Sequence, residues 1–307
     1  MSPSDFWDVL VLGVVLGSLY AVIAIGYTLV YGVLQLLNFA HSEVFMSGGF
    51  GGLIALTIVE PVAEPSVVQS AWYVVLGMCA GAALGGVVAF GLERVAYRPL
   101  RRRHAPRLVF LITAVGASFF LYNLAGKLFG RQPIPMPDMY ENRRLFSVFG
   151  ASVNVTQAII VVAAVLMLVG VDFVVNRTKL GSGIRAVAQD PEVASLMGVD
   201  IDKVVSRTFV LGGLMGGVAG FLFGTNLQVE YTMGFLPGIT AFAAAVLGGI
   251  GNVRGAMLGG LTLGIVEAFT VELTSDSWRY VGAFAVLVLV LMFRPTGILG
   301  ERVGRAA

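Results

Sequence analysis

Long apolar segments separated by short polar stretches constrain this chain more strongly than any other feature of its sequence. A helix that spans a bilayer needs about 20 predominantly apolar residues, and segments approaching that length recur from one end to the other. They are Phe6–Tyr31, Leu36–Val59, Trp72–Leu92, Leu108–Phe129, Val155–Val175, Val205–Leu227, Ile239–Ile250, Ala256–Leu273 and Tyr280–Phe293. Charged residues make up only 12% of the chain, roughly half the share of a soluble domain. The sequence therefore predicts an all-α integral membrane protein, a polytopic bundle of transmembrane segments.

One of these segments, Ile239–Ile250, is short for an ordinary crossing. It is rich in alanine and glycine and directly follows Pro237 and Gly238. Two interpretations fit this composition: a re-entrant half-helix, or a crossing that other helices shield from lipid. We therefore expect about eight transmembrane segments if it is re-entrant and about nine if it crosses.

The basic residues predict how the bundle is oriented. Cytoplasmic loops of membrane proteins are enriched in Lys and Arg. If every segment crosses, all but five of the Lys and Arg residues fall on one side of the membrane, including Arg254, Arg294, Arg302 and Arg305. The exceptions are Lys127, Arg131, Arg143, Arg144 and Arg279. We therefore expect the N-terminus outside and the C-terminus in the cytoplasm.

The cytoplasmic insert at residues 176–204 contains a short segment with helix-capping residues at both ends. Asp190 is a favourable N-cap, Pro191 fits the first helical position, and Glu192 suits the positive end of the helix dipole. Gly198 fits the left-handed position that often ends a helix. The pattern predicts a helix of about two turns over Pro191–Met197.

This predicted helix carries an apolar face formed by Val193, Leu196 and Met197. Such a helix can lie on the bilayer surface. Alternatively, it docks on a cytoplasmic partner and passes a rigid-body movement of that partner to the spans. We favour docking, because an apolar face with a cap at each end exceeds what a loop needs and such patches often mark interfaces.

Polar side chains gather in Leu36–Glu43, at the inner end of the second segment. Asn38, His41 and Ser42 are spaced to share one face of a helix, and Glu43 lies toward another side. Polar groups at membrane depth are costly and usually face a cavity or a partner helix. These four residues are therefore candidates for a transport pathway or its gate. The alternative is an ordinary helix start in the headgroup region.

A run of glycines begins at Gly248 and leads into the next apolar span. Gly251 and Gly255 have the GxxxG spacing that permits close helix contact, and we interpret both, with Gly248 and Gly259, as helix-packing positions. Glu267 follows inside the same span. It needs a partner or water, and is a further candidate for the pathway or gate.

Two segments are expected outside the membrane. Gly130–Asn154 contains the alternate prolines Pro133, Pro135 and Pro137, which cannot continue a helix, so we expect an extended loop. The polar residues of the second segment follow the sixth span, where they line an entrance, meet an external partner or form a solvated loop. They are Asn226, Gln228, Glu230 and Tyr231.

The sequence lacks the motifs of an energy-converting or catalytic site. It has no phosphate-binding G-x-x-x-x-G-K-[ST] loop, no zinc-ligand spacing and no nucleophile elbow. The single Cys79 provides no Cys-based metal site, and two histidines disfavour a multi-histidine one. We therefore predict no catalytic residue, no metal and no cofactor, and expect another chain to supply the energy for any active transport.

Two long stretches resemble the branched-chain amino acid permeases, the LivH-type subunits of ABC importers. Gly26–Glu43, which reads GYTLVYGVLQLLNFAHSE, is similar to their signature, and Ile184–Gly198, IRAVAQDPEVASLMG, resembles their cytoplasmic coupling loop. The glycine run up to Glu267 and the closing Phe293–Gly297 also resemble them. One departure is Ser42, which stands where this family's signature has glycine.

The resemblance implies one transmembrane permease domain over residues 1–307, in the inner membrane of a bacterium, with residues 176–204 as the coupling loop. It implies a second, related permease, two cytoplasmic ATPases that bind the coupling helices, and a periplasmic or surface protein that delivers the solute. It assigns ATPase coupling to Arg185, Asp190, Pro191, Glu192, Ala194 and Gly198.

Three functions are compatible with these observations. The first is a permease of an ATP-driven importer for branched-chain amino acids or related small polar solutes, such as other amino acids, amides or urea. The second is a secondary transporter or channel that works alone, with Glu43 and Glu267 as coupling or gating groups. The third is a membrane scaffold without transport, against which the polar residues inside spans argue.

Overall fold

The computed structural model describes residues 3–148 and 150–300, and nearly all of their regular structure is helical. In chain order the elements are α1 (Pro3–Leu34), α2 (His41–Val59), α3 (Val67–Leu92), the π-helix η1 (Glu93–Tyr97), α4 (Arg98–Arg102), α5 (Arg107–Leu128), β1 (Arg144–Val148), β2 (Ala151–Asn154), α6 (Val155–Arg177), α7 (Lys179–Gln189), α8 (Pro191–Leu196), α9 (Ile201–Asn226), α10 (Phe235–Gly248), α11 (Val253–Leu273), the 3₁₀-helix η2 (Asp276–Trp278) and α12 (Arg279–Phe293). Eight helical stretches in the described part are long and apolar enough to cross a membrane. The predicted all-α polytopic bundle is confirmed.

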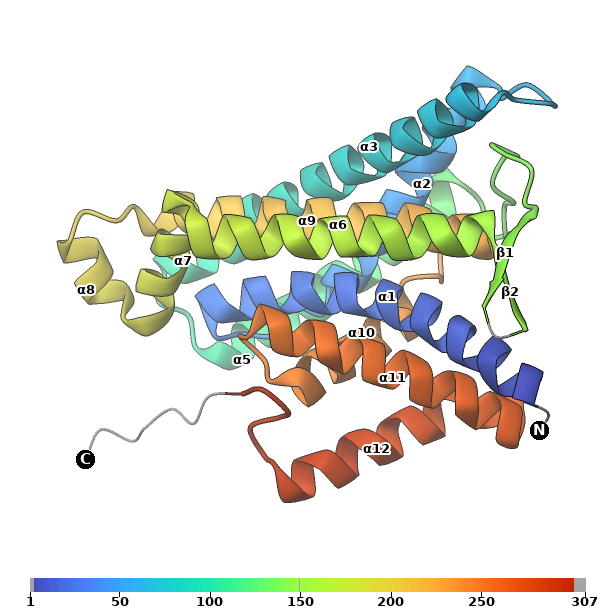
Figure 1. Cartoon of the computed structure of the whole chain (residues 1–307). Coiled ribbons are helices and arrows are strands. Elements are labelled where there is room, and N and C mark those ends of the chain that lie inside the picture. The colour runs from blue at the N-terminus through green and yellow to red at the C-terminus, as the bar shows by residue number, and fades with distance from the viewer. Residues whose placement is uncertain (1–2, 149, 301–307) are drawn as a thin grey trace.

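The long helices lie side by side, and the bundle has two distinct ends. Figure 1 shows α8 at one end and the β1–β2 hairpin, with the start of α1, at the other. We call these the α8 end and the hairpin end. The hairpin lies within the segment predicted as an extended loop, where β1 and β2 pair antiparallel. Between Gly130 and this hairpin the chain is irregular, as its alternate prolines require.

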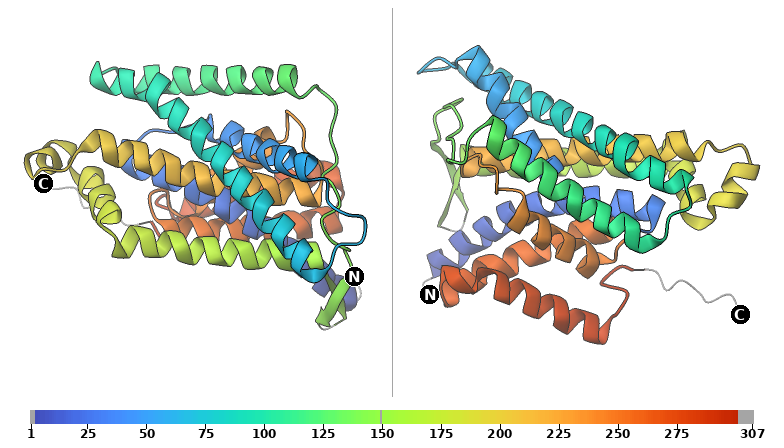
Figure 2. Two further views of the ribbon diagram at one scale, coloured as in Figure 1. Left: turned by 90° about the horizontal axis from the view of Figure 1, so that it is seen from above. Right: turned by 180° about the vertical axis from the view of Figure 1, so that it is seen from behind.

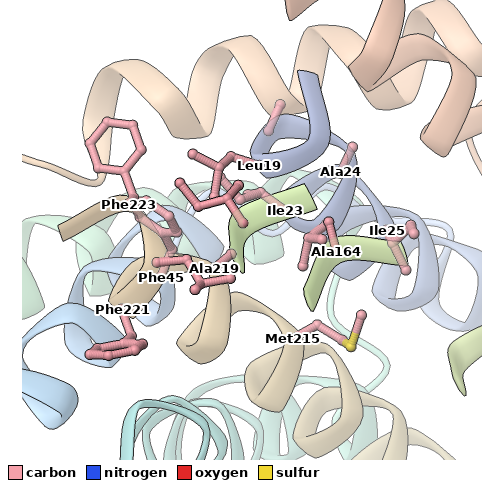
Figure 3. Packing of buried hydrophobic residues seen from close by; sticks show 14 of the residues in the cluster. Leu19, Ile23, Ala24, Ile25, Phe45, Ala164, Met215, Ala219, Phe221 and Phe223 are labelled. Atoms are coloured by element: carbon pink, nitrogen blue, oxygen red, sulfur yellow. The ribbon is translucent and has the colours of Figure 1, made fainter. Parts of the chain in front are cut away.

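Helix α1 occupies the centre of the bundle and packs along α11, α9, α10 and α6. Its side chains Leu19, Ile23 and Ile25 belong to the largest apolar cluster, together with Phe45 of α2 and Met215 of α9 (Figure 3). A helix that is apolar on every side can be buried on every side. This uniform apolarity allows α1 to be enclosed by its neighbours on every side.

Helices α5 and α12 lie at the periphery of the bundle (Figure 2). Large apolar side chains such as Phe120 of α5 and Met292 of α12 are mostly exposed. In water this exposure would be costly, whereas lipid or an apolar partner covers it at no such cost. The peripheral helices therefore present many of the exposed apolar side chains of this protein.

The turn between α1 and α2 differs from the predicted span Leu36–Val59. Helix α1 ends at Leu34, Gln35 adopts a left-handed backbone with φ of +52°, and α2 begins only at His41. Asn38 therefore precedes the helix, and its backbone oxygen accepts the N–H of His41 at 3.1 Å. The prediction that Asn38 shares a helical face with His41 and Ser42 was wrong, because hydrophobicity does not reveal where a helix breaks.

The short helix α10 belongs to a crossing and not to a re-entrant loop. Helix α9 reaches the hairpin end, where Val229 of the following segment pairs with Ile134. The chain then passes through α10 and enters α11 at the α8 end, where Arg254 pairs with Asp172 near the end of α6 at 3.0 Å. Of the two interpretations of this segment, the shielded crossing is the one that the structure contains, and nine of its residues are buried.

Helices α2 and α10 both begin at the centre of the bundle and run in opposite directions. The first turn of α2 lies against Gly26, which is roughly 12 Å before the end of α1 at about 1.5 Å per residue, and against Gly216 near the middle of α9. The first turn of α10 meets it there, since a Cβ built on Gly238 would collide with Ser42. Helix α2 leads to the hairpin end and α10 to the α8 end. Helices that begin inside the bundle in this way are common in transporters.

The predicted packing glycines divide into two groups. A Cβ on Gly248 would collide with the backbone of Gly255, and one on Gly259 with the carbonyl of Ala244, so these three glycines permit close contact of α10 with α11. Gly251 does not take part. It lies in the turn between the helices with φ of +96° and open space around it. The prediction that Gly251 is a helix-packing position was therefore wrong, although its GxxxG spacing with Gly255 is present.

The structure brings most of the predicted inner-side basic residues to the α8 end. Arg98, Arg101 and Arg102 gather around Asp202 at the start of α9, and Arg254 lies at the same end. Arg302 and Arg305 lie outside the described residues.

Candidate functional site

Helix α8 is capped at its start as the sequence predicts. The Asp190 carboxylate accepts the backbone N–H groups of Glu192 at 2.9 Å and Val193 at 3.0 Å, which satisfies two of the donors that a helix N-terminus leaves free. Pro191 is the first helical residue, and Gly198 adopts φ of +85° just beyond the end. The helix covers Pro191–Leu196, one residue less than predicted.

The apolar face of α8 points away from the bundle. Val193, Leu196 and Met197 are 52%, 87% and 80% exposed, whereas Ala194 on the other side is 4% exposed. The Ala194 carbonyl also accepts the N–H of Val199 at 3.0 Å, which holds the end of α8 against the following turn. The result is a rigid helix that presents three adjoining apolar side chains outward.

Helix α7 supports α8 and was not predicted from the sequence. Its buried residues Ile184 and Val187 pack in one apolar cluster with Val204 and Phe209 of α9. Arg185, on the exposed side, donates to the carbonyl of Val175 and so ties α7 to the end of α6. The spacing of Ile184 and Val187 at i and i+3 is the sequence signal that would have revealed this helix.

Asp202 at the start of α9 connects this helix to α4, which follows the third span. It accepts hydrogen bonds from Arg98 at 2.7 Å, Arg101 at 2.6 Å and Arg102 at 2.8 Å. Its neighbour Asp200 caps α9 by accepting the backbone N–H of Lys203, and this bond lowers the pKa of the Asp200 carboxyl below its ordinary value. The sequence indicates only the side of the membrane on which these arginines lie and not their acceptor, because Asp202 lies about a hundred residues further along the chain.

The π-helix η1 places two buried polar residues in the same network. Glu93 is fully buried and accepts from Arg101 at 3.0 Å and from Ser206 at 2.6 Å. Tyr97, also fully buried, donates its hydroxyl to the side-chain oxygen of Asn38 at 2.7 Å. Single turns of π-helix often occur at functional sites. Here the turn links the arginines around Asp202 to the α1–α2 turn.

His41 begins α2 at the centre of the bundle. Its ring is 1% exposed and lies 4.8 Å from the ring of Tyr27, in an edge-on arrangement. A Cβ on Gly26 would overlap the imidazole, so this glycine makes room for it. No described residue bonds the buried Nε2 atom.

Glu43 lies one position beyond Ser42 in the same turn and is 2% exposed. Its Oε1 atom accepts hydrogen bonds from Ser118 of α5 at 3.1 Å and from Ser42 at 3.3 Å. Its Oε2 atom is buried and has no hydrogen-bond partner among the described residues. A buried carboxylate oxygen without a partner is rare, and a ligand is one of its common explanations.

One cavity adjoins this turn, and a second cavity adjoins the first. The inner cavity, of about 560 Å³, is lined by residues that include Ser42, Glu43, Ser118 and Phe242. The outer cavity, of about 550 Å³, lies toward the hairpin end and is lined by residues that include Asn226, Gln228 and Tyr280. The two share a boundary made by Glu230, Thr232 and Leu236. The polar segment after the sixth span thus lines a cavity, whereas the ring of Tyr231 lies 4.9 Å from that of Tyr122 in a tilted arrangement.

Glu267 lies apart from this centre. It is fully buried between α1, α11 and α12, where its Oε1 accepts from Tyr20 at 3.1 Å and from Arg279 at 3.2 Å. The partners that the sequence required but did not name are therefore Arg279, which forms an ion pair with Glu267, and the hydroxyl of Tyr20. Glu267 lines neither cavity, so the structure does not bring it together with Glu43.

Known proteins match this chain over nearly its whole length, including the residues described above. A family model described as the permease component of branched-chain amino acid transport systems matches residues 9–292. The chain is 39% identical to the high-affinity branched-chain amino acid transport system permease protein LivH of Salmonella typhimurium, over 94% of both chains. It is 40% identical to the corresponding permease BraD of Pseudomonas aeruginosa, over 95% of both chains. An end-to-end match at this level of identity shows the family: the chain belongs to the permease components of branched-chain amino acid transport systems.

Proposed function

We propose that this chain is the non-catalytic, membrane-spanning subunit of an ATP-driven importer and forms its translocation pathway. The solute is a branched-chain amino acid or a related small polar solute, in line with what the relatives are named for. The observation that carries the proposal is the capped helix α8, whose exposed apolar side chains offer a docking surface for an ATPase. ATP hydrolysis is assigned to the partner chains.

The proposed assembly contains a second permease, two cytoplasmic ATPases and a periplasmic or surface solute-binding protein. The bundle lies in the bacterial inner membrane with its α8 end in the cytoplasm. The gathering of Arg98, Arg101, Arg102 and Arg254 at that end supports this orientation, since basic residues are enriched on the cytoplasmic side. The solute-binding protein then meets the hairpin end, where the outer cavity lies.

Within this chain the pathway follows the two cavities. It enters through the outer cavity, passes the boundary at Glu230, Thr232 and Leu236, and reaches Ser42 and Glu43 at the centre. His41 and Asn38 set the position of this turn through their contacts with Gly26 and Tyr97. We assign Glu267 a structural role, because it forms an ion pair with Arg279 and lines neither cavity.

Reconstitution separates this function from that of a transporter working alone. Proteoliposomes with the complete complex should take up a radiolabelled branched-chain amino acid only when ATP and the loaded binding protein are present. The permease alone should support no uptake under a proton or sodium gradient. Gradient-driven uptake by the permease alone would instead support the secondary transporter, with the unpaired oxygen of Glu43 as its coupling group.

A further inference from the structure

Glu43 places a single unsatisfied anionic group beside the inner cavity. Ser42 and Ser118 fix its Oε1 atom and leave Oε2 without a partner among the described residues. A buried carboxylate oxygen that lacks a partner costs the free energy of its lost hydration. Because Glu43 also lines the inner cavity, a donor that enters it can meet this carboxylate, and a positively charged donor offsets the cost best.

The charged side chains that line the two cavities are acidic. Glu43 lines the inner cavity, Glu230 lines both cavities, and no described Lys or Arg lines either. A passage with one sign of charge and apolar walls attracts groups of the opposite sign. The lining therefore favours a solute that carries an ammonium group at Glu43 and at Glu230.

The remaining walls of the inner cavity are apolar and aromatic. Phe39, Phe119 and Phe242 contribute rings, and Ile239 and Val115 contribute branched side chains. Such walls accept an aliphatic side chain, and ring faces also attract a cation. The volume of about 560 Å³ lies within the usual range for small-molecule sites, about 300–1,000 Å³.

The first turn of α10 lies on another side of the same cavity, where Phe235 and Leu236 line it. The beginning of a helix carries a partial positive charge, which favours a carboxylate. In the first turn of α10 the N–H groups of Phe235 and Gly238 bond carbonyl groups of the chain, and Pro237 has no N–H. The backbone N–H of Leu236 is therefore the donor that this turn offers. Half-length helices that begin at the centre of a transporter commonly present this end to anionic groups of the solute. The inner cavity thus combines an anionic group, a positive helix end and apolar walls.

We propose that the inner cavity is an amino-acid-binding site in the pathway, in which the Glu43 carboxylate binds the ammonium group of the solute. The first turn of α10 receives the solute carboxylate, and Phe39, Phe119 and Phe242 surround its aliphatic side chain. This inference rests on the proposed function, since it names how the permease itself recognises the solute that the importer carries.

The test uses the complete complex in proteoliposomes with three variants. Glu43→Gln keeps the shape and removes the charge, Glu43→Asp keeps the charge, and Glu272→Gln makes the same chemical change at an exposed residue outside both cavities. Glu43→Gln should lower the uptake of L-leucine about 10-fold to 100-fold, because a charge-assisted hydrogen bond is lost. Glu43→Asp should retain more uptake than Glu43→Gln, and Glu272→Gln should match the wild type. ATP hydrolysis stimulated by the loaded binding protein should persist in all three.

Solute analogues test the assigned groups directly. In a complex of permeases and ATPases without the binding protein, isoamylamine keeps the ammonium and the side chain, whereas 4-methylpentanoate lacks the ammonium. Isoamylamine should displace bound radiolabelled L-leucine from this complex at a concentration about 10-fold lower than 4-methylpentanoate requires. The variant Glu43→Gln should abolish this difference. Equal competition by the two in the wild type would overturn the assignment.

The remaining outcomes separate this inference from the proposed function. Wild-type uptake by Glu43→Gln would overturn the binding role while leaving the importer in place. Loss of stimulated ATP hydrolysis together with uptake would also overturn it, because Glu43 would then act in coupling. A wild-type complex that hydrolyses ATP but takes up no amino acid would refute the proposed function itself.

Discussion

The hydroxyl of Tyr97 donates a 2.7 Å hydrogen bond to the side-chain oxygen of Asn38, and both residues are buried. Tyr97 ends the π-helix that begins at Glu93, and Glu93 bonds Arg101, which in turn bonds Asp202 next to α8. Asn38 precedes the turn that carries Ser42 and Glu43. These polar contacts, joined by the backbone of the π-helix, therefore connect the start of α9 to the turn that lines the inner cavity.

Tyr97→Phe should destabilise the protein by about 1–3 kcal/mol, because it leaves the buried oxygen of Asn38 without a partner. Thermal unfolding of the purified protein in detergent measures the loss. Tyr31→Phe removes a hydroxyl from a partly exposed tyrosine near the end of α1 and is the matched control. If the two variants unfold at the same temperature, the Tyr97–Asn38 bond contributes nothing.

Asp202→Asn should separate α4 from α9, since three arginines lose their shared carboxylate. Because these groups are partly exposed, we expect a loss of about 1–3 kcal/mol, smaller at high salt. Unfolding temperatures at low and high ionic strength provide the measurement. Asp138→Asn, in the exposed loop before β1, should leave the unfolding temperature unchanged at both.

Leu196→Asp should prevent the permease from binding its ATPases, because it places a charge in the exposed apolar face of α8. Co-purification of the ATPases with tagged permease measures assembly, and uptake measures its consequence. Leu145→Asp changes an exposed leucine of β1 at the opposite end and should assemble normally. Normal assembly of both variants would contradict the docking role of α8.

Glu192→Ala and Gly198→Ala test the same role without altering the apolar face. Gly198 has φ of +85°, which costs an alanine about 1–2 kcal/mol, so this variant should tilt or fray the end of α8. We expect each to hydrolyse ATP with less uptake per ATP, at normal levels in the membrane. Normal uptake per ATP in both would argue against the role assigned to these caps.

Gly26→Ala should destabilise the bundle by about 1–3 kcal/mol or more, because a Cβ there overlaps the His41 ring. Gly32→Ala lies in the same helix with open space around its Cβ and should be neutral or slightly stabilising. The difference in unfolding temperature between the two variants reports on the fit of His41 at the centre. Equal unfolding temperatures would show that the ring moves aside freely.

Local sequence signals predicted those parts of the protein that local forces decide. Apolar length predicted the spans, because lipid requires uninterrupted apolar helices. Capping chemistry predicted α8, because Asp190 bonds amides only two and three residues away. The family signature and the coupling loop were likewise recognisable from contiguous residues, and the comparisons confirm the family that they indicated.

Only the tertiary structure decided which polar residues meet. Asp202 binds arginines about a hundred residues earlier in the chain, and Glu267 finds Tyr20 of α1. Hydrophobicity also did not reveal that α2 starts at His41, since Leu36 and Leu37 are as apolar as the helix that follows. The depth of Glu43 depends on that break and on the glycines that admit His41 and Ser42. Composition thus determined that this chain lies in a membrane, whereas long-range packing determined which charges it holds at its centre.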